Sequence, residues 1–183
     1  MVPANFQLQY KREEIDAAVH RMGVDITRWA QKVWDESHTD LVAIPVLRGG
    51  IFFFADVVRQ IDASVEIAPI RTWVYESSEN NVQREETRVS LEGVHVKGRS
   101  VLLVDDICDS GKTLKLLTKM FLEHGALEVR SAVLVKRILK EETFNPDWVG
   151  FSYRGPEWMV GYGMEDCNRW RNLQSIYIIQ QGS

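Results

Sequence analysis

The chain has 183 residues, of which 45% are hydrophobic and 26% charged, a composition typical of one globular domain with a sizeable core. The formal net charge of −4, without a long basic run, argues against nucleic acid as the main partner, and no apolar run is long enough for a membrane span or signal peptide. The two cysteines, Cys108 and Cys167, have neither metal-ligand spacing nor a disulfide framework, so we expect a reducing, cytoplasmic setting.

An amphipathic helix is the first predicted element, between residues 11 and 37, after a leader with little pattern. The apolar residues that recur there at every third or fourth position are Ile15, Val19, Met22, Ile26, Trp29 and Val33. Gly23 could divide this segment into two helices. We interpret it as a packing element without chemistry of its own.

A buried strand is predicted over residues 41–46, followed by Leu47-Arg48-Gly49-Gly50 and a helix that begins near Ile51. Two glycines after a strand allow the backbone to approach a ligand closely, and the Arg48 guanidinium can bind an anion. On its own this signal is weak, because such turns are frequent and Arg48 could be an ordinary surface residue.

Residues 65–75 form the third predicted strand, and the polar segment 76–88 follows it without an apolar period. One interpretation is a surface hairpin without fixed structure. The other is a mobile loop that closes over a substrate and excludes water from it.

The most informative segment is 101–125, which predicts a strand, an acidic loop and a helix. Four apolar residues, 101–104, are followed by three carboxylates and then by a small polar run. Leu114, Leu117 and Phe121 lie on one side of the predicted helix, and His124-Gly125 ends it. In open α/β sheets, ligands bind at such a loop beyond the carboxyl end of a parallel strand.

The chemistry of this loop predicts a ligand with two different ends. Residues 110–113 place two hydroxyls, one ammonium group and the free amides of a helix N-terminus together, which suits a phosphate. The neighbouring carboxylates would repel that phosphate unless they face sugar hydroxyls or a divalent cation. A ribose 5-phosphate satisfies both requirements.

Three other kinds of segment share part of this pattern. A nucleoside-triphosphatase P-loop needs a glycine where this chain has Asp106. A serine-hydrolase elbow needs G-x-S-x-G, which is missing. An ordinary strand-to-helix turn with a capping side chain is common, but such a turn rarely needs three carboxylates together with Gly-Lys-Thr.

Residues 129–135 form the next predicted strand, ending in Lys136-Arg137, and residues 175–180 form a closing strand. Between them lie two aromatic segments, 145–151 and 158–163. Taken alone, Lys136 could be a solvated strand end, Trp158 a core aromatic and Arg171 half of a surface salt bridge.

Residues 101–114 resemble the phosphoribosyl-pyrophosphate (PRPP) signature of type I phosphoribosyltransferases, a specific motif. The segments 146–151 and 158–162 resemble the purine-binding hood of the hypoxanthine-guanine branch, and the resemblance extends from about residue 12 to 180. It implies an α/β fold with a mainly parallel central sheet flanked by helices. It also implies a single domain over 1–183, with a core at about 38–150 and a hood from about 1–37 and 151–183.

The resemblance also implies a role for each matching residue. The residues that would bind PRPP and its 5-phosphate are Asp105, Asp106, Asp109, Ser110, Gly111, Lys112 and Thr113. Those that would bind pyrophosphate are Leu47, Arg48, Gly49 and Arg171, with a non-proline cis peptide between Leu47 and Arg48. Those that would bind the purine are Lys136, Trp158, Met159 and Glu165.

Two positions depart from the family pattern. The mobile loop of the family begins with Ser-Tyr, whereas this chain has Val74-Tyr75, so only Tyr75 matches. The family has Asp at the position of Glu165, and the extra methylene could shift a contact with the base or with a metal-bound water.

The function implied is transfer of phosphoribosyl from PRPP to a 6-oxopurine, hypoxanthine or guanine, giving a nucleoside monophosphate and pyrophosphate. Asp109 is the implied general base, and Mg²⁺ is the implied cofactor, held by Asp105, Asp106 and Glu165 through water. We expect a homodimer or homotetramer that binds neither nucleic acid nor membrane. The alternatives are a xanthine-guanine enzyme and a PRPP-sensing regulator that binds nucleic acid.

Overall fold

The computed structural model describes residues 2–79, 82–90, 93–139 and 144–180. Its elements in chain order are β1 Phe6–Tyr10, α1 Arg12–Ser37, β2 Leu41–Leu47, α2 Ile51–Val58, β3 Val65–Ile67, β4 Ile70–Glu79, β5 Val82–Ser90, β6 Ser100–Cys108, α3 Lys112–Glu123, β7 Glu128–Arg137, β8 Trp148–Tyr153, β9 Met159–Val160 and β10 Ile176–Ile179. None of the helices in these ranges is long and apolar enough to cross a membrane.

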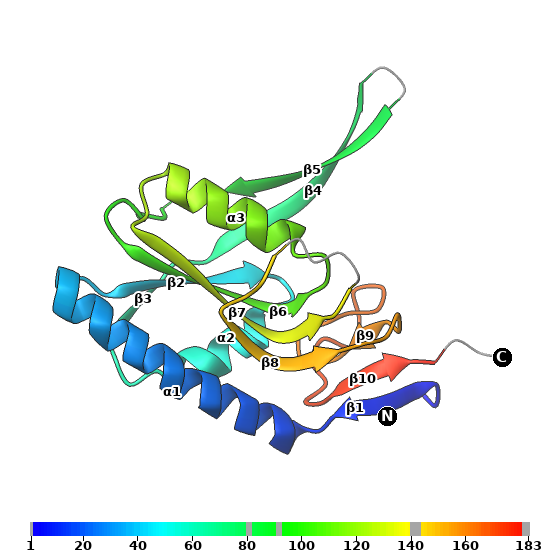
Figure 1. Cartoon of the computed structure of the whole chain (residues 1–183). Coiled ribbons are helices and arrows are strands. Elements are labelled where there is room, and N and C mark those ends of the chain that lie inside the picture. The colour runs from blue at the N-terminus through cyan, green and yellow to red at the C-terminus, as the bar shows by residue number, and fades with distance from the viewer. Residues whose placement is uncertain (1, 80–81, 91–92, 140–143, 181–183) are drawn as a thin grey trace.

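A seven-stranded sheet forms the centre, in the order β5-β4-β2-β6-β7-β8, with β3 paired to β2 outside this path. The strands β4, β2, β6, β7 and β8 pair in parallel, and β5 pairs antiparallel to β4 at one edge. Figure 1 shows α3 on one face of this sheet and α1 with α2 on the other. The expected fold, a mainly parallel sheet flanked by helices, is confirmed.

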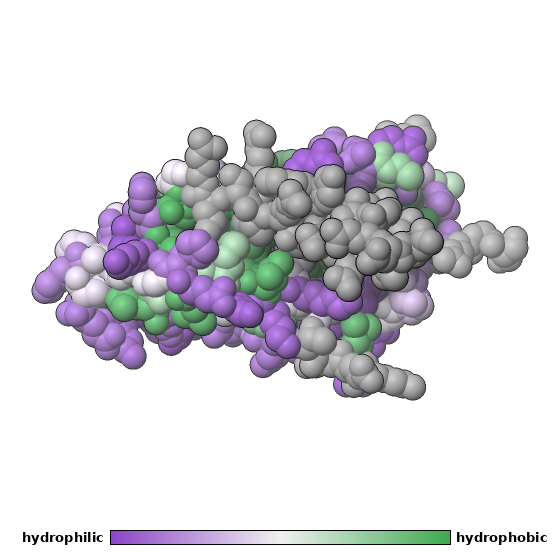
Figure 2. All heavy atoms as spheres, turned by 90° about the horizontal axis from the view of Figure 1, so that it is seen from above, coloured by the Kyte–Doolittle hydropathy of each residue, from purple (hydrophilic) through white to green (hydrophobic). Residues whose placement is uncertain are grey.

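The sheet has a separate hydrophobic core on each face. Successive residues of β6 alternate between them: Leu102 and Val104 belong to the core beneath α1 and α2, whereas Val101 and Leu103 belong to the core beneath α3. Strands that are apolar on both faces explain why β2 and β6 appear in the sequence as continuous apolar runs. Seen from above, the described surface outside these cores is mostly hydrophilic, with small hydrophobic areas between polar groups (Figure 2).

A second, three-stranded antiparallel sheet lies beside the main one, in the order β1-β10-β9 (Figure 1). It joins the two ends of the described chain, because Phe6 pairs with Ile179 and Tyr10 with Ile176. The expected closing strand is therefore confirmed as β10. The expectation that residues 1–10 have little pattern missed β1, whose partner lies at the other end of the sequence.

The expected boundaries of the hood differ from those of this small sheet. The helix α1, assigned to the hood from the sequence, contributes nine buried residues and packs against α2 and the main sheet. The strand β8 also belongs to the main sheet, through its parallel pairing with β7. We therefore place the hood at β1, β9, β10 and the turns between β8 and β10.

The helix α1 is continuous through Gly23, so this glycine does not divide the segment into two helices. Close packing explains why a glycine stands at this position: a Cβ atom on Gly23 would lie 2.3 Å from Cβ of Gln60. Glycine is therefore needed for contact with the turn after α2 rather than for a change of direction.

The predicted strand over 65–75 is two strands, β3 and β4, and β4 continues to Glu79. The polar segment 76–88 lies largely within β4 and β5, which form an antiparallel hairpin with Tyr75 opposite Glu86. Antiparallel ladders are built from backbone hydrogen bonds, so a polar sequence without an apolar period can still form one. Figure 1 shows this hairpin projecting away from the body of the molecule.

Candidate active site

The predicted strand–loop–helix is present as β6, a short loop and α3. The loop turns into the helix at Gly111, whose φ of 74° lies in the left-handed region. A Cβ atom on this glycine would lie 2.5 Å from Cβ of Phe144. Glycine is thus required both by the backbone conformation and by the residue packed over it.

A small cavity of about 140 Å³ lies at the start of α3. Its lining residues are Asp105, Ile107, Cys108, Asp109, Ser110, Gly111, Lys112, Thr113 and Leu114. The Lys112 amide donates to Ser110 Oγ at 3.4 Å, a long contact that a stronger acceptor can replace. Free amides and a helix dipole at this position favour an anion of about the size of a phosphate.

Asp105, which lines this cavity, and its neighbour Asp106 lie near the end of β6, and they are only 8% and 7% exposed. Burial, reinforced by the charge of Asp106, raises the pKa of Asp105 well above its usual range. Burial also raises the pKa of Asp106, although hydrogen bonds from Asp105 and the Ile107 amide offset part of that rise. Such a pair carries one negative charge more readily than two, and can both donate to and accept from sugar hydroxyls.

The loop after β2 reaches the same acidic pair. The Leu47–Arg48 peptide bond is cis, as the resemblance implied. A Cβ atom on Gly49 would lie 2.3 Å from Asp106 Oδ2, so only glycine lets this loop approach the carboxylate. The Arg48 side chain extends toward the hood, where Nη2 donates to Asn168 Oδ1 at 2.9 Å.

The hood packs on this loop through a second close approach. Gly163 has a φ of 108°, and a Cβ atom there would lie 2.0 Å from the carbonyl oxygen of Gly49. Nη1 of Arg171 donates to the Gly163 carbonyl at 2.7 Å, and Nη2 lies 3.6 Å from Glu165 Oε1. The hood turn and the loop after β2 are thus fixed against each other near Asp106.

A larger cavity of about 260 Å³ lies where these segments meet. Its lining residues are Gly49, Asp106, Ile107, Asp109, Arg137, Trp158, Met159, Met164, Glu165 and Arg171. Trp158 is 60% exposed, and its indole N–H donates to the Glu165 carbonyl at 2.6 Å, which orients the ring. An exposed aromatic ring held in this way can stack on a planar ligand.

The expected site residues therefore divide into two groups. The cavities unite all of the expected residues except Leu47, Arg48, Tyr75 and Lys136. Lys136 is buried in β7, and its Nζ donates to Asn145 Oδ1 at 2.7 Å. Lys136 pairs with Cys108 of β6, and Cys108 belongs to the core beneath α3. Because paired residues point to the same face of a sheet, the Lys136 side chain starts on the face covered by α3 rather than on the face of Ile107. Tyr75 lies in β4 of the projecting hairpin.

Sequence reasoning missed Arg137 and Asn168. Arg137 lines the larger cavity, and its Nε lies 2.5 Å from Asp109 Oδ1. Asn168, with a φ of 62°, holds Arg48. The alternation of a strand could have placed Arg137 on the face opposite Lys136, but no sequence pattern marks Asn168.

A divalent cation would find two adjacent carboxylates here, from Asp105 and Asp106. In the part of the chain that the structure describes, no group of three or more His, Cys, Asp or Glu side chains is arranged to hold a metal ion. Glu165 instead lies beside Arg171 and accepts from the Asn168 amide. This arrangement fits Mg²⁺, which usually takes one or two carboxylates and completes its shell with water and substrate oxygens.

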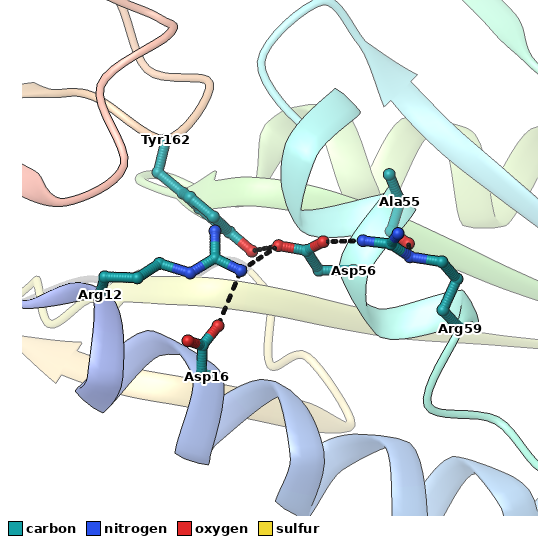
Figure 3. A network of polar contacts seen from close by, with 6 residues as sticks. All are labelled: Arg12, Asp16, Ala55, Asp56, Arg59 and Tyr162. Carbon is teal, nitrogen blue, oxygen red and sulfur yellow. Dashed lines mark hydrogen bonds and ion pairs between the residues drawn. The ribbon is translucent and has the colours of Figure 1, made fainter.

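A polar network fixes the base of the hood turn (Figure 3). The Tyr162 hydroxyl donates to Asp56 Oδ2 at 2.5 Å, and Arg12 of α1 and Arg59 also contact the Asp56 carboxylate, at 3.0 and 2.5 Å. Burial alone would raise the pKa of Asp56, but the hydrogen bonds from Tyr162 and Arg59 and the charge of Arg12 outweigh it and lower the pKa. The network connects α1, α2 and the turn that carries Gly163.

Tyr162→Phe is expected to lower the free energy of unfolding by about 1–2 kcal/mol at neutral pH, because it removes a hydrogen bond to the partly buried Asp56 carboxylate. A lowered pKa means that this stabilisation is present above the unfolded value of about 3.9 and is lost as the pH falls through the folded value. Urea unfolding of both proteins, from neutral pH toward the acid limit of folding, measures this. Tyr153→Phe, which removes a hydroxyl hydrogen-bonded to the half-buried Glu157, is the control and should lower the free energy of unfolding by less. A Tyr162→Phe deficit that stays constant with pH would contradict the account.

Known proteins resemble this chain in sequence over most of its length. The phosphoribosyl transferase domain family matches residues 13–166. A hypoxanthine phosphoribosyltransferase of Haemophilus influenzae is 32% identical over 164 residues, 89% of each chain. A hypoxanthine-guanine phosphoribosyltransferase of Bacillus subtilis is 30% identical over 170 residues, 92% of this chain and 89% of its own.

Solved structures share the fold over nearly the whole chain. A hypoxanthine phosphoribosyltransferase from Staphylococcus aureus superposes with a TM-score of 0.78 at 21% identity, covering 95% of this chain and 91% of its own. A hypoxanthine-guanine phosphoribosyltransferase from Bacillus anthracis superposes with a TM-score of 0.77 at 26% identity, covering 95% and 98%. The similarity thus includes both the strand–loop–helix segment and the hood.

Proposed function

This chain belongs to the phosphoribosyltransferase family, and we infer that it is a purine salvage enzyme that transfers phosphoribosyl from PRPP to hypoxanthine or guanine. The relatives named above carry these two bases in their names. The observation that most strongly supports the inference is the pair of adjoining cavities, one at the amides of α3 and one beside Trp158, with Asp109 lining both.

The ends of PRPP match the two sides of this site. The 5-phosphate would bind at residues 110–113, and the ribose hydroxyls at the buried pair of Asp105 and Asp106. The pyrophosphate would bind at Arg48, at Arg171 and at the backbone of Gly49. Mg²⁺, when bound, would neutralise the charge that develops on the departing diphosphate.

The base would stack on Trp158, with Met159 and Ile107 forming the apolar wall of the cavity. Loss of pyrophosphate leaves cationic character at the anomeric carbon, and a purine nitrogen attacks it. Asp109 lies between the phosphate cavity and the base cavity, where its carboxylate can accept the proton of that nitrogen. The resemblance implies that Lys136 contacts the exocyclic oxygen of the purine; Nζ, which has three N–H donors, would donate to that oxygen in addition to Asn145 Oδ1 or in place of it.

Initial-rate assays with PRPP, Mg²⁺ and hypoxanthine, guanine or xanthine test the proposed function. We expect nucleoside monophosphate from hypoxanthine and guanine, and much slower turnover of xanthine. Removal of divalent cations with a chelator should abolish turnover, and added Mg²⁺ should restore it. Preferred turnover of xanthine would identify the other branch. No turnover of any base, together with salt-sensitive binding of nucleic acid, would support the regulator.

Assembly as a homodimer or homotetramer remains part of this proposal. Apolar side chains are exposed at Ile51, Phe52 and Ile67, by 47%, 40% and 55%, and could be covered by a second copy. Light scattering of the protein as it elutes from a size-exclusion column measures the mass of the assembly directly, and a monomeric mass would contradict the proposed homodimer or homotetramer.

A further inference from the structure

The last residue of β7, Arg137, lies at the junction of three parts of the site. Nε donates to Asp109 Oδ1 at 2.5 Å, Nη1 donates to the Gly155 carbonyl, and Nη2 donates to the Glu157 carbonyl at 3.2 Å. All three guanidinium nitrogens are therefore engaged, and the side chain is only 11% exposed. A planar fork held in this way has little freedom to rotate.

Tyr153 supports the guanidinium from β8. The Arg137 guanidinium carbon lies 5.5 Å from the centre of the Tyr153 ring, and the Tyr153 hydroxyl donates to Glu157 Oε2 at 2.6 Å. Burial and the hydrogen bond to Glu157 raise the pKa of Tyr153 to about 12, so this hydroxyl stays a donor at neutral pH. Arg137 thus holds the turn at 155–157 through the backbone carbonyls of Gly155 and Glu157, and Tyr153 holds it through the Glu157 side chain.

The two partners of Arg137 belong to opposite sides of the cavity. Asp109 begins the phosphate loop, whereas the turn at 155–157 leads directly into Trp158. Only Oδ1 of Asp109 is engaged by the ion pair, and Oδ2 has no hydrogen-bond partner among the described residues. The ion pair therefore fixes the orientation of the carboxylate and leaves one oxygen for a substrate proton.

We propose that Arg137 is a positioning residue: it orients the Asp109 carboxylate and fixes the distance between the phosphate loop and the purine platform at Trp158. This inference rests on the proposed function, in which Asp109 is the base. A structural role alone would predict a loss of stability, whereas positioning predicts a loss in the chemical step and in use of the purine.

Arg137→Gln tests the proposal. We expect kcat/KM for hypoxanthine to fall about 10- to 100-fold, because misplacing a reacting group by about 1 Å can cost that much. The affinity for PRPP should stay within about threefold, because the hydrogen bonds of Arg137 go to Asp109 and to the carbonyl groups of Gly155 and Glu157. Arg137→Lys, which keeps the charge but offers no fork, should be intermediate.

The matched control is Arg130→Gln. Arg130 is an arginine of the same strand, it pairs with Glu128 at 2.6 Å, and it lies over the Trp29 ring at 4.9 Å. It lies about 23 Å along β7 from Arg137, since a strand rises about 3.3 Å per residue. Its replacement should lower stability without changing the kinetic constants.

Chemical rescue separates positioning from folding. Guanidinium ion, at millimolar concentrations too low to denature, should restore part of kcat to Arg137→Ala and should not activate Arg130→Ala. Normal kcat and normal purine KM in Arg137→Gln would overturn the inference, as would a loss of PRPP affinity equal to the loss of kcat. An inactive wild-type chain would instead reject the proposed function, so the two failures are distinguishable.

Discussion

Replacing Asp109 by asparagine is expected to lower kcat by about 10²- to 10⁴-fold, the usual contribution of a general base. Asparagine keeps the size of the side chain but cannot accept the proton of the attacking purine nitrogen. The hydrogen bond from Arg137 can persist to its carbonyl oxygen, so the loop should keep its shape. PRPP affinity should therefore change little, since the 5-phosphate is held by the amides of residues 110–113.

Single-turnover kinetics with saturating PRPP, and calorimetric titration with PRPP and Mg²⁺, measure the two effects separately. Asp62→Asn, which removes one exposed carboxylate on the loop after α2, is the control and should behave like the wild type. An equal loss of turnover and of PRPP affinity would remove Asp109 from the role of base and leave it as a ligand of the sugar.

The second large effect is expected for Gly163→Ala. A methyl group there would lie 2.0 Å from the carbonyl oxygen of Gly49, and a φ of 108° is unfavourable for alanine. Relief of the clash must move the hood turn away from the loop that holds Gly49 and Arg48. We expect a loss of about 2–4 kcal/mol in the free energy of unfolding and at least a tenfold rise in the KM for PRPP.

Gly98→Ala is the matched control for this change. Gly98 also has a positive φ, 71°, but a Cβ atom there would meet nothing within 4 Å. Gly98→Ala should lower the free energy of unfolding by about 1–2 kcal/mol, the cost of a left-handed backbone conformation for alanine, and should leave the kinetic constants unchanged. Urea unfolding and initial rates measure both variants. Similar kinetics in the two would show that the contact between Gly163 and Gly49 does not shape the site.

The segment from β6 to α3 was the part of the fold most accessible to sequence reasoning. Its strand is apolar on both faces, its helix shows a regular apolar period, and its loop contains residue types that a plain turn rarely needs. All of this information is local. The same holds for β2, Gly49 and α2, where a strand, a glycine turn and a helix follow one another within the chain.

The remaining differences come from contacts between distant parts of the chain. The first ten residues carry little local signal, and β1 forms because β10 offers it an edge. Gly23 suggested a break because the sequence does not show that Gln60 packs against it. Lys136 and Arg137 are adjacent basic residues, and which of them faces the cavity depends on the register of β7 against β6.

Docking of PRPP at the start of α3 is the event on which every proposed residue role depends, and calorimetric titration of the wild-type chain with PRPP in the presence of Mg²⁺ tests it most directly. We expect saturable heat corresponding to one site per chain, greatly weakened by Gly111→Ala, which would force the phosphate loop away from Phe144. A flat titration of the wild-type protein, or full binding by Gly111→Ala, would contradict the assignment of residues 110–113 as the phosphate site.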